Sequence, residues 1–133
     1  MSEFSSPSTP APMLFVTFTG REITAVRRCV TRHAAQAGLR GDQLHDFVLA
    51  VNEIVTNAVV HGGGHGELRL WDNGRTVGCE VVDAGPGGVA EVTAEPARGT
   101  DGRGLRLARL LVDDLDVLES PTGTKVRLVA ALT

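Results

Sequence analysis

The hydrophobic positions of the chain follow a helical period in two long segments. Between residues 42 and 61 apolar side chains recur three and four positions apart over several turns, the spacing that places them on one helix face. We expect Asp42 to be the N-cap of this helix and the glycine run after it to be its end. A shorter pattern of the same kind predicts a helix over residues 21–37, with Gly38 as its stop.

Short alternating or β-branched runs predict strands between and after these helices. Asn73-Gly74 separates two such runs and predicts a tight hairpin, and Pro121-Thr122-Gly123 predicts a turn between the last two. The predicted strands, the first of them an edge strand, cover residues 14–18, 68–71, 77–82, 115–118 and 125–132.

A third, short helix is expected over residues 105–112, with Leu107, Leu110 and Leu111 facing the core. It follows a stretch, residues 84–103, that is rich in glycine and proline and has no period. A long irregular segment within a compact domain is usually functional.

The order β-α-α-β-β-loop-α-β-β has hairpins near both ends. It predicts an α+β fold, a two-layer α/β sandwich with a mixed, mostly antiparallel sheet and helices on one face. Residues 1–12 are rich in Ser, Thr and Pro and are expected to be a disordered tail. Residues 13–133 are expected to form one domain.

Composition narrows the function. The chain has 133 residues, 42% of them hydrophobic, and a net charge of −3, so it can bury a core and has no basic stripe for a phosphate backbone. Direct nucleic-acid binding is therefore disfavoured. No apolar run is long enough to span a membrane, and no signal peptide is evident, so we expect a cytoplasmic protein. Cys29 and Cys79 are expected to be buried, reduced thiols.

Glu53, Asn57 and His61 are four residues apart on the long predicted helix and therefore share one face, beside the apolar one. A carboxylate there can act as a general base. An amide oxygen suits Mg²⁺, which prefers oxygen ligands shared with phosphates. The alternative is that all three are solvated residues of a helix edge.

Asp83 follows a predicted strand and precedes Gly85 and Gly87. A carboxylate beside a backbone without Cβ atoms can accept from a flat donor such as the adenine amino group. The alternative is a turn aspartate that stabilises its own loop.

Gly102-Arg103-Gly104 stands directly before the third predicted helix, where free N–H groups can bind phosphate. Arg98 and Arg103 could pair with phosphate oxygens. The alternative is an ordinary junction between a loop and a helix, with solvated arginines.

Three rival motifs are weaker. Residues 85–90 fit a dinucleotide-binding glycine pattern, but no helix and no second acidic strand end follow. The pairs His61 with His65 and Cys29 with His33 lack partners for a zinc site. No serine stands at a strand-turn-helix elbow, as a hydrolase of that type needs.

Taken together, the segments Glu53 to His61, Asp83 to Gly87 and Gly102 to Leu105 resemble the Bergerat (GHKL) ATP-binding fold. They are most similar to the anti-sigma-factor serine/threonine kinases of bacteria. The resemblance covers nearly all of residues 14–133.

The resemblance implies ATP and Mg²⁺ as cofactors and a role for each motif residue. Glu53 would be the general base, Asn57 the Mg²⁺ ligand and Asp83 the ligand of the adenine amino group. Thr124 would support Asp83 through water, and residues 88–101 would form a lid. The remaining nucleotide-binding residues implied are Gly85, Gly87, Arg98, Gly102, Arg103, Gly104 and Leu105.

The resemblance also implies partners: a sigma factor held inactive, an anti-anti-sigma protein of STAS type that is phosphorylated, and a possible homodimer. A non-catalytic module that binds ATP, or no nucleotide, and acts only by sequestering a partner is the alternative.

Overall fold

The computed structural model describes residues 12–83 and 105–132, which form one sheet and the helices packed on it. The elements are β1 (Leu14–Thr19), the 3-10 turn η1 (Gly20–Glu22), α1 (Ile23–Ala37), α2 (Gly41–His61), β2 (His65–Asp72), β3 (Thr76–Asp83), α5 (Leu105–Leu111), β4 (Asp114–Ser120) and β5 (Gly123–Ala131). Their order is the predicted one. None of these helices is long and apolar enough to cross a membrane.

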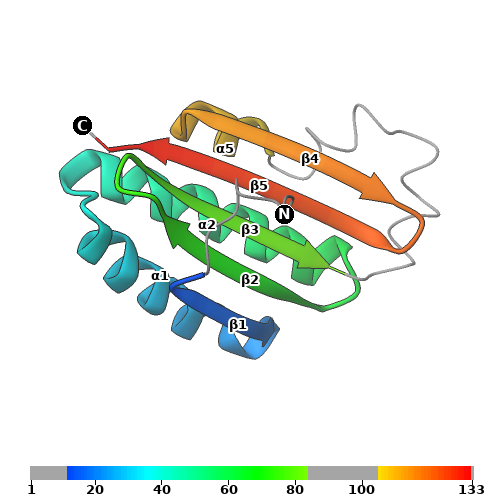
Figure 1. The fold of residues 1–133 in the computed structure, drawn as a ribbon. Coiled ribbons are helices and arrows are strands. Elements are labelled where there is room, and N and C mark those ends of the chain that lie inside the picture. Colours follow the sequence, from blue (N-terminus) through cyan, green and yellow to red (C-terminus); the bar gives the residue numbers. More distant parts are fainter. Residues whose placement is uncertain (1–11, 84–104, 133) are drawn as a thin grey trace, which may run out of the picture.

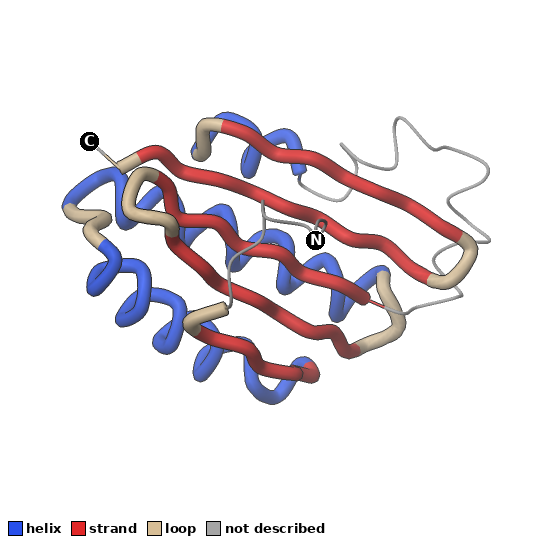
Figure 2. Tube along the Cα trace, in the orientation of Figure 1, coloured by secondary structure: helices blue, strands red, loops and turns tan. Residues whose placement is uncertain are grey.

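The five strands lie in the order β1-β2-β3-β5-β4, and the three α-helices cover one face of the sheet (Figures 1 and 2). This confirms the two-layer α+β sandwich, and β1 is an edge strand as expected. All four strand pairs of the described residues are antiparallel. The sheet was expected to be mixed, but these residues include no parallel pair.

The core lies between α2 and the inward side chains of the central strands. Phe47, Val51 and Ile54 of α2 are at most 1% exposed and belong to one cluster with Leu70 and Leu128 of the sheet. Burying each such side chain contributes roughly 1.5–3 kcal/mol. The apolar face therefore fixes the rotation of α2, and with it the direction of the polar residues along its edge.

The predicted Asn-Gly hairpin joins β2 to β3. The Asn73 side chain accepts from the backbone N–H groups of Arg75 (2.9 Å) and Thr76 (2.8 Å), and Asp72 accepts from that of Gly74 (3.0 Å). Gly74 has a φ of 87°, a left-handed conformation that glycine adopts readily. Side-chain acceptors thus replace ladder bonds in the turn.

The predicted Asp42 N-cap is wrong. The helix begins at Gly41, and the extended residue Arg40 is its N-cap, with a carbonyl that accepts from Leu44 N–H at 3.2 Å. Asp42 is already in the first turn, where its charge is favourable toward the helix dipole. The predicted stop of α1 is confirmed, since Gly38 has a φ of 123° and ends that helix.

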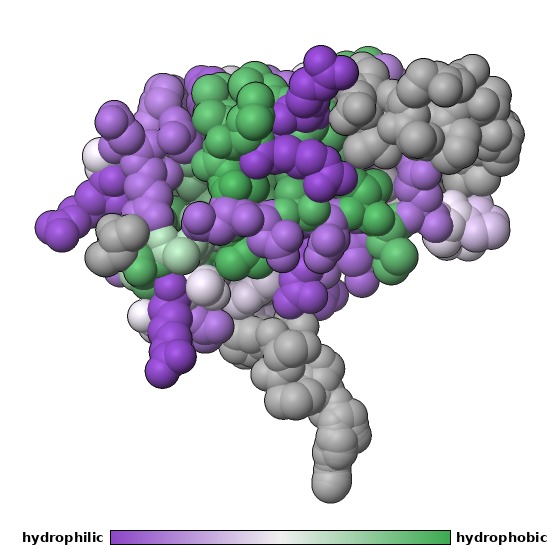
Figure 3. Space-filling model, turned by 90° about the horizontal axis from the view of Figure 1, so that it is seen from above, coloured by the Kyte–Doolittle hydropathy of each residue, from purple (hydrophilic) through white to green (hydrophobic). Residues whose placement is uncertain are grey.

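The predicted inward face of α5 is wrong for Leu107 and Leu110, whereas Leu111 packs against the core as predicted. Leu105 and Ala108 are buried, whereas Leu107 is 43% and Leu110 77% exposed; Leu111 is half-buried. The seven-residue helix buries its first residue, Leu105, and Ala108 three positions later. The leucines alone do not show which side of the helix faces the sheet. Figure 3 looks onto this edge of the molecule and shows hydrophobic side chains at its surface.

Candidate functional site

The polar stripe of α2 lies where the sequence places it, beside the buried face. Glu53 and Asn57 are half-buried, and His61, the last residue of the helix, is exposed. Ile54 and Ala58, each next to one of them, are buried. The stripe therefore turns polar groups toward the border between helix and solvent, where a ligand can contact them.

Asn57 carries an unusual amide. Its Nδ2 atom is buried and has no hydrogen-bond partner among the described residues. A buried polar group without a partner costs free energy, so its persistence calls for an explanation. Rotation about the last side-chain bond exchanges nitrogen and oxygen, so this amide can also turn its oxygen to a cation. The donor type suits Mg²⁺.

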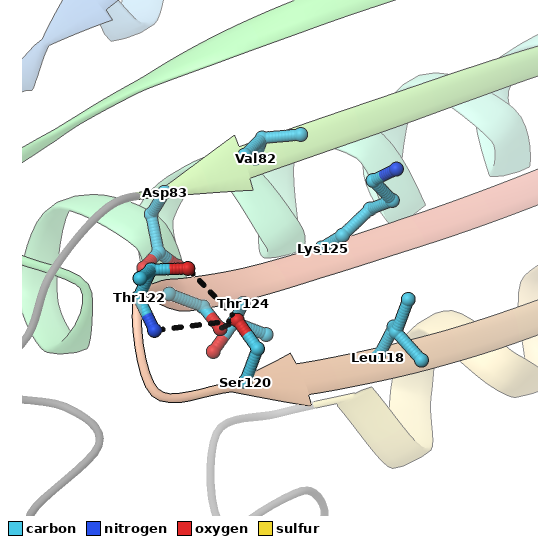
Figure 4. A pocket seen from close by; sticks show the side chains of 8 residues that line it. Val82, Asp83, Leu118, Ser120, Thr122, Thr124 and Lys125 are labelled. Atoms are coloured by element: carbon cyan, nitrogen blue, oxygen red, sulfur yellow. Dashed lines mark hydrogen bonds between the residues drawn. The ribbon is translucent and has the colours of Figure 1, made fainter.

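Asp83 and Thr124 form a second polar group at the ends of β3 and β5. They are Cα partners in the β3–β5 ladder and are 6% and 8% exposed, the buried polar residues of the described chain. In Figure 4 the Asp83 side chain points toward Thr122 and Thr124. Thr124 and Asp83, which were predicted to interact, therefore lie side by side. The water predicted to bridge them stays a prediction.

The end of α2 meets the end of β3 at one close approach. Gly62, the C-cap residue of α2, lies so near that an ideal Cβ there would be 2.3 Å from Cγ of Asp83. At a rise of 1.5 Å per residue, Asn57 is roughly 7.5 Å and Glu53 roughly 13.5 Å back along the helix axis from Gly62. The Asp83 carboxylate therefore lies at the C-terminal end of the helix that carries the polar stripe.

A pocket of about 480 Å³ opens at the same strand ends (Figure 4). Asp83 and Thr124 belong to the helix-covered side of the sheet, whereas Val82 and Lys125 alternate to the other side, so the pocket wraps around the strand ends. Its lining consists of Val82, Asp83, Leu118, Ser120, Thr122, Gly123, Thr124 and Lys125. Glu53 and Asn57 do not line it.

The glycine turns and the predicted lid lie outside the described residues. This applies to Gly85, Gly87, Arg98, Gly102, Arg103 and Gly104. Leu105 is described, and its side chain is buried in the core at 2% exposure. A nucleotide contact from Leu105 would therefore have to come from its backbone. In residues 12–83 and 105–132, no three His, Cys, Asp or Glu side chains gather as a metal site.

Sequence reasoning missed two features of this region. It placed Gly62 in a helix stop and at the end of the family-like segment that starts at Glu53, with no role toward Asp83. It also gave no role to Ser120, whose hydroxyl accepts from the backbone N–H of Thr122 at 3.3 Å. The glycine directly after His61 was the available signal for the first. The signal for the second was a serine directly before Pro-Thr-Gly, since a serine in a turn can accept from the backbone N–H two residues on.

Comparison with known proteins agrees with this arrangement. The model of the histidine kinase-like ATPase domain matches residues 16–130. The chain is 30% identical over 114 residues to an anti-sigma F factor of Thermoanaerobacter sp. strain X514, covering 77% of this chain and 80% of the relative. An anti-sigma F factor of Thermoanaerobacter pseudethanolicus matches equally.

Among solved structures, the fold resembles that of the RsbU and RsbW domains of Rv1364c from Mycobacterium tuberculosis. The TM-score is 0.64 at 23% identity, over 90% of this chain and 33% of that longer one. That likeness concerns the fold. With the family match over most of its length, the chain belongs to the histidine kinase-like ATPase domain family and has anti-sigma F factors among its relatives.

Proposed function

We propose that this protein is an ATP-binding anti-sigma factor with serine/threonine kinase activity. It holds a sigma factor inactive and phosphorylates an anti-anti-sigma protein of STAS type. The family match and the anti-sigma relatives support the regulatory part. The presence of Glu53 on α2 supports the catalytic part, because a protein that acts only by sequestering a partner needs no general base.

One observation carries the nucleotide site: the close approach of Gly62 to the Asp83 carboxylate. This contact supports a base-recognising role for Asp83, whose carboxylate lies at the C-terminal end of α2, the helix that carries Asn57 and Glu53. A nucleotide lying along α2 would have its adenine at Asp83 and its phosphates beside Asn57. Gly102, Gly104, Arg98 and Arg103 are proposed to complete the phosphate site.

The chemistry asked of the chain is proton transfer and charge balance. Glu53 would accept the proton of the incoming Ser or Thr hydroxyl as its oxygen bonds to the γ-phosphorus and the bond to the ADP oxygen breaks. Asn57 would hold Mg²⁺ through its amide oxygen. When bound, the cation neutralises phosphate charge. The orphaned amide of Asn57 fits this role.

The test is phosphate transfer. The purified protein is incubated with labelled ATP, Mg²⁺ and each STAS-type protein encoded in the same genome, and sigma factors are assayed for complex formation. Label on one STAS protein and a stable sigma-factor complex would support the proposal. A sigma-factor complex without any transfer would instead support the non-catalytic sequestering module.

A further inference from the structure

Gly62 has a backbone conformation that does not itself require glycine. Its φ is −109° and its ψ is 27°, which any residue can adopt, and its N–H donates to the carbonyl of Ala58 at 2.9 Å as the end of α2. Gly63 and Gly64 differ in this respect, with φ values of 95° and 93°. If position 62 requires glycine, the reason must be that a Cβ atom there has no room.

The carboxyl group of Asp83 occupies the space where a Cβ atom of residue 62 would lie. An ideal Cβ on Gly62 would lie 2.3 Å from Cγ, 2.4 Å from Oδ2 and 2.7 Å from Oδ1 of Asp83, whereas real Cβ atoms keep beyond 3.0 Å. All three contacts belong to the carboxyl group. Since Asp83 is only 6% exposed, its carboxyl has little room to turn away without leaving its present place.

We propose that Gly62 is a positioning residue for base recognition: the missing side chain is what allows the Asp83 carboxylate to occupy its place at the end of β3. This rests on the proposed function, in which that carboxylate accepts from the adenine amino group. Any side chain at position 62 would displace the recognising atoms themselves, not a neighbouring part of the fold.

The first experiment compares Gly62→Ala with the wild type in calorimetric titrations of ATP and of GTP, both with Mg²⁺. GTP carries an oxygen where ATP carries the 6-amino group, so it cannot make the proposed bond from that position to Asp83 and serves as the reference for binding through the phosphates. We expect ATP affinity to fall about 10–100-fold while GTP affinity does not fall. Unchanged ATP affinity, or a parallel loss for both nucleotides, would overturn the proposal.

Gly64→Ala is the matched control. A Cβ there meets nothing within 4 Å, but its φ of 93° strains any other residue. It should lower stability without changing the ratio of ATP to GTP affinity. A change in that ratio equal to that of Gly62→Ala would mean that loss of stability alone explains the effect.

A second measurement covers the case in which Gly62→Ala does not fold, and it needs no nucleotide. Asp83→Ala removes the three clashing atoms, so the double variant should fold or melt higher than Gly62→Ala alone, by roughly 4–8 °C. If the double variant is no more stable than Gly62→Ala, the inferred contact between position 62 and Asp83 is wrong. A wild type that binds no ATP would overturn the proposed function and the base-recognition role, while the rescue still decides the contact.

Discussion

Two neighbouring residues surround the Asp83 side chain, one with a polar side chain and one with none. Thr124 stands across the ladder from it, and Gly62 leaves the room that its carboxylate occupies. The acid was predicted from its position at the end of a strand, and Thr124 from the resemblance to the Bergerat fold. The sequence could not predict the contact with Gly62, which depends on how the end of α2 meets β3.

Asp83→Asn tests the acid directly. It puts an amide NH₂ or a weaker acceptor against the adenine amino group, and the loss of a charge-assisted bond worth about 1.5–3 kcal/mol should lower ATP affinity about 10–100-fold. Calorimetric titration measures this. Wild-type affinity in the variant would mean that the adenine binds elsewhere.

Glu53→Ala tests the base. We expect the rate of phosphate transfer to fall by about 10²–10⁴-fold, because the hydroxyl loses its proton acceptor, while ATP binding is retained. The exposed Glu67→Ala on β2 is the control and should transfer normally. Transfer by Glu53→Ala at a rate close to that of the wild type would remove Glu53 from the mechanism.

The two cysteines differ in their surroundings. Burial, and to a lesser degree the charge of Glu80, raises the pKa of the Cys79 thiol far above its ordinary value, so it stays protonated at neutral pH. Cys29 is half-buried. At pH 8 iodoacetamide should label Cys29 in the native protein and Cys79 only after unfolding, as read by mass spectrometry. Rapid labelling of both native thiols would contradict the packing.

At the scale of elements, prediction succeeded where the hydrophobic period was long. The 21-residue helix α2 and the Asn-Gly hairpin were found from their patterns, although each strand is one or more residues longer than predicted. The phase of α5 was not found. In a leucine-rich helix of two turns, leucines lie on several sides. Which of them are buried depends on how the helix packs on the sheet.

The same substitution at two positions of α5 tests that phase. Leu105→Ala should lower the free energy of unfolding by about 2–5 kcal/mol because it opens a cavity in the core. Leu110→Ala, at a side chain 77% exposed, should change it by less than about 0.5 kcal/mol. Urea denaturation measures both. The reverse order would restore the face predicted from sequence.

At the scale of the whole molecule, the two faces of the sheet have different characters. The helix-covered face holds the core and Asp83, whereas the other carries a register row of alternating charge across four strands, Arg69, Glu80, Arg127 and Asp116. Arg127 also lies 5.0 Å from the centre of the Trp71 ring. Asp83, the proposed base-recognising residue, therefore lies on the face opposite to this charged row.

The proposed site for MgATP spans α2 and the end of β3. Calorimetric titration of ATP into the purified protein, with Mg²⁺ and with the cation removed by chelation, tests this proposal. We expect binding that depends on Mg²⁺. Absence of binding with Mg²⁺ present, in a protein whose circular dichroism shows that it is folded, would contradict it.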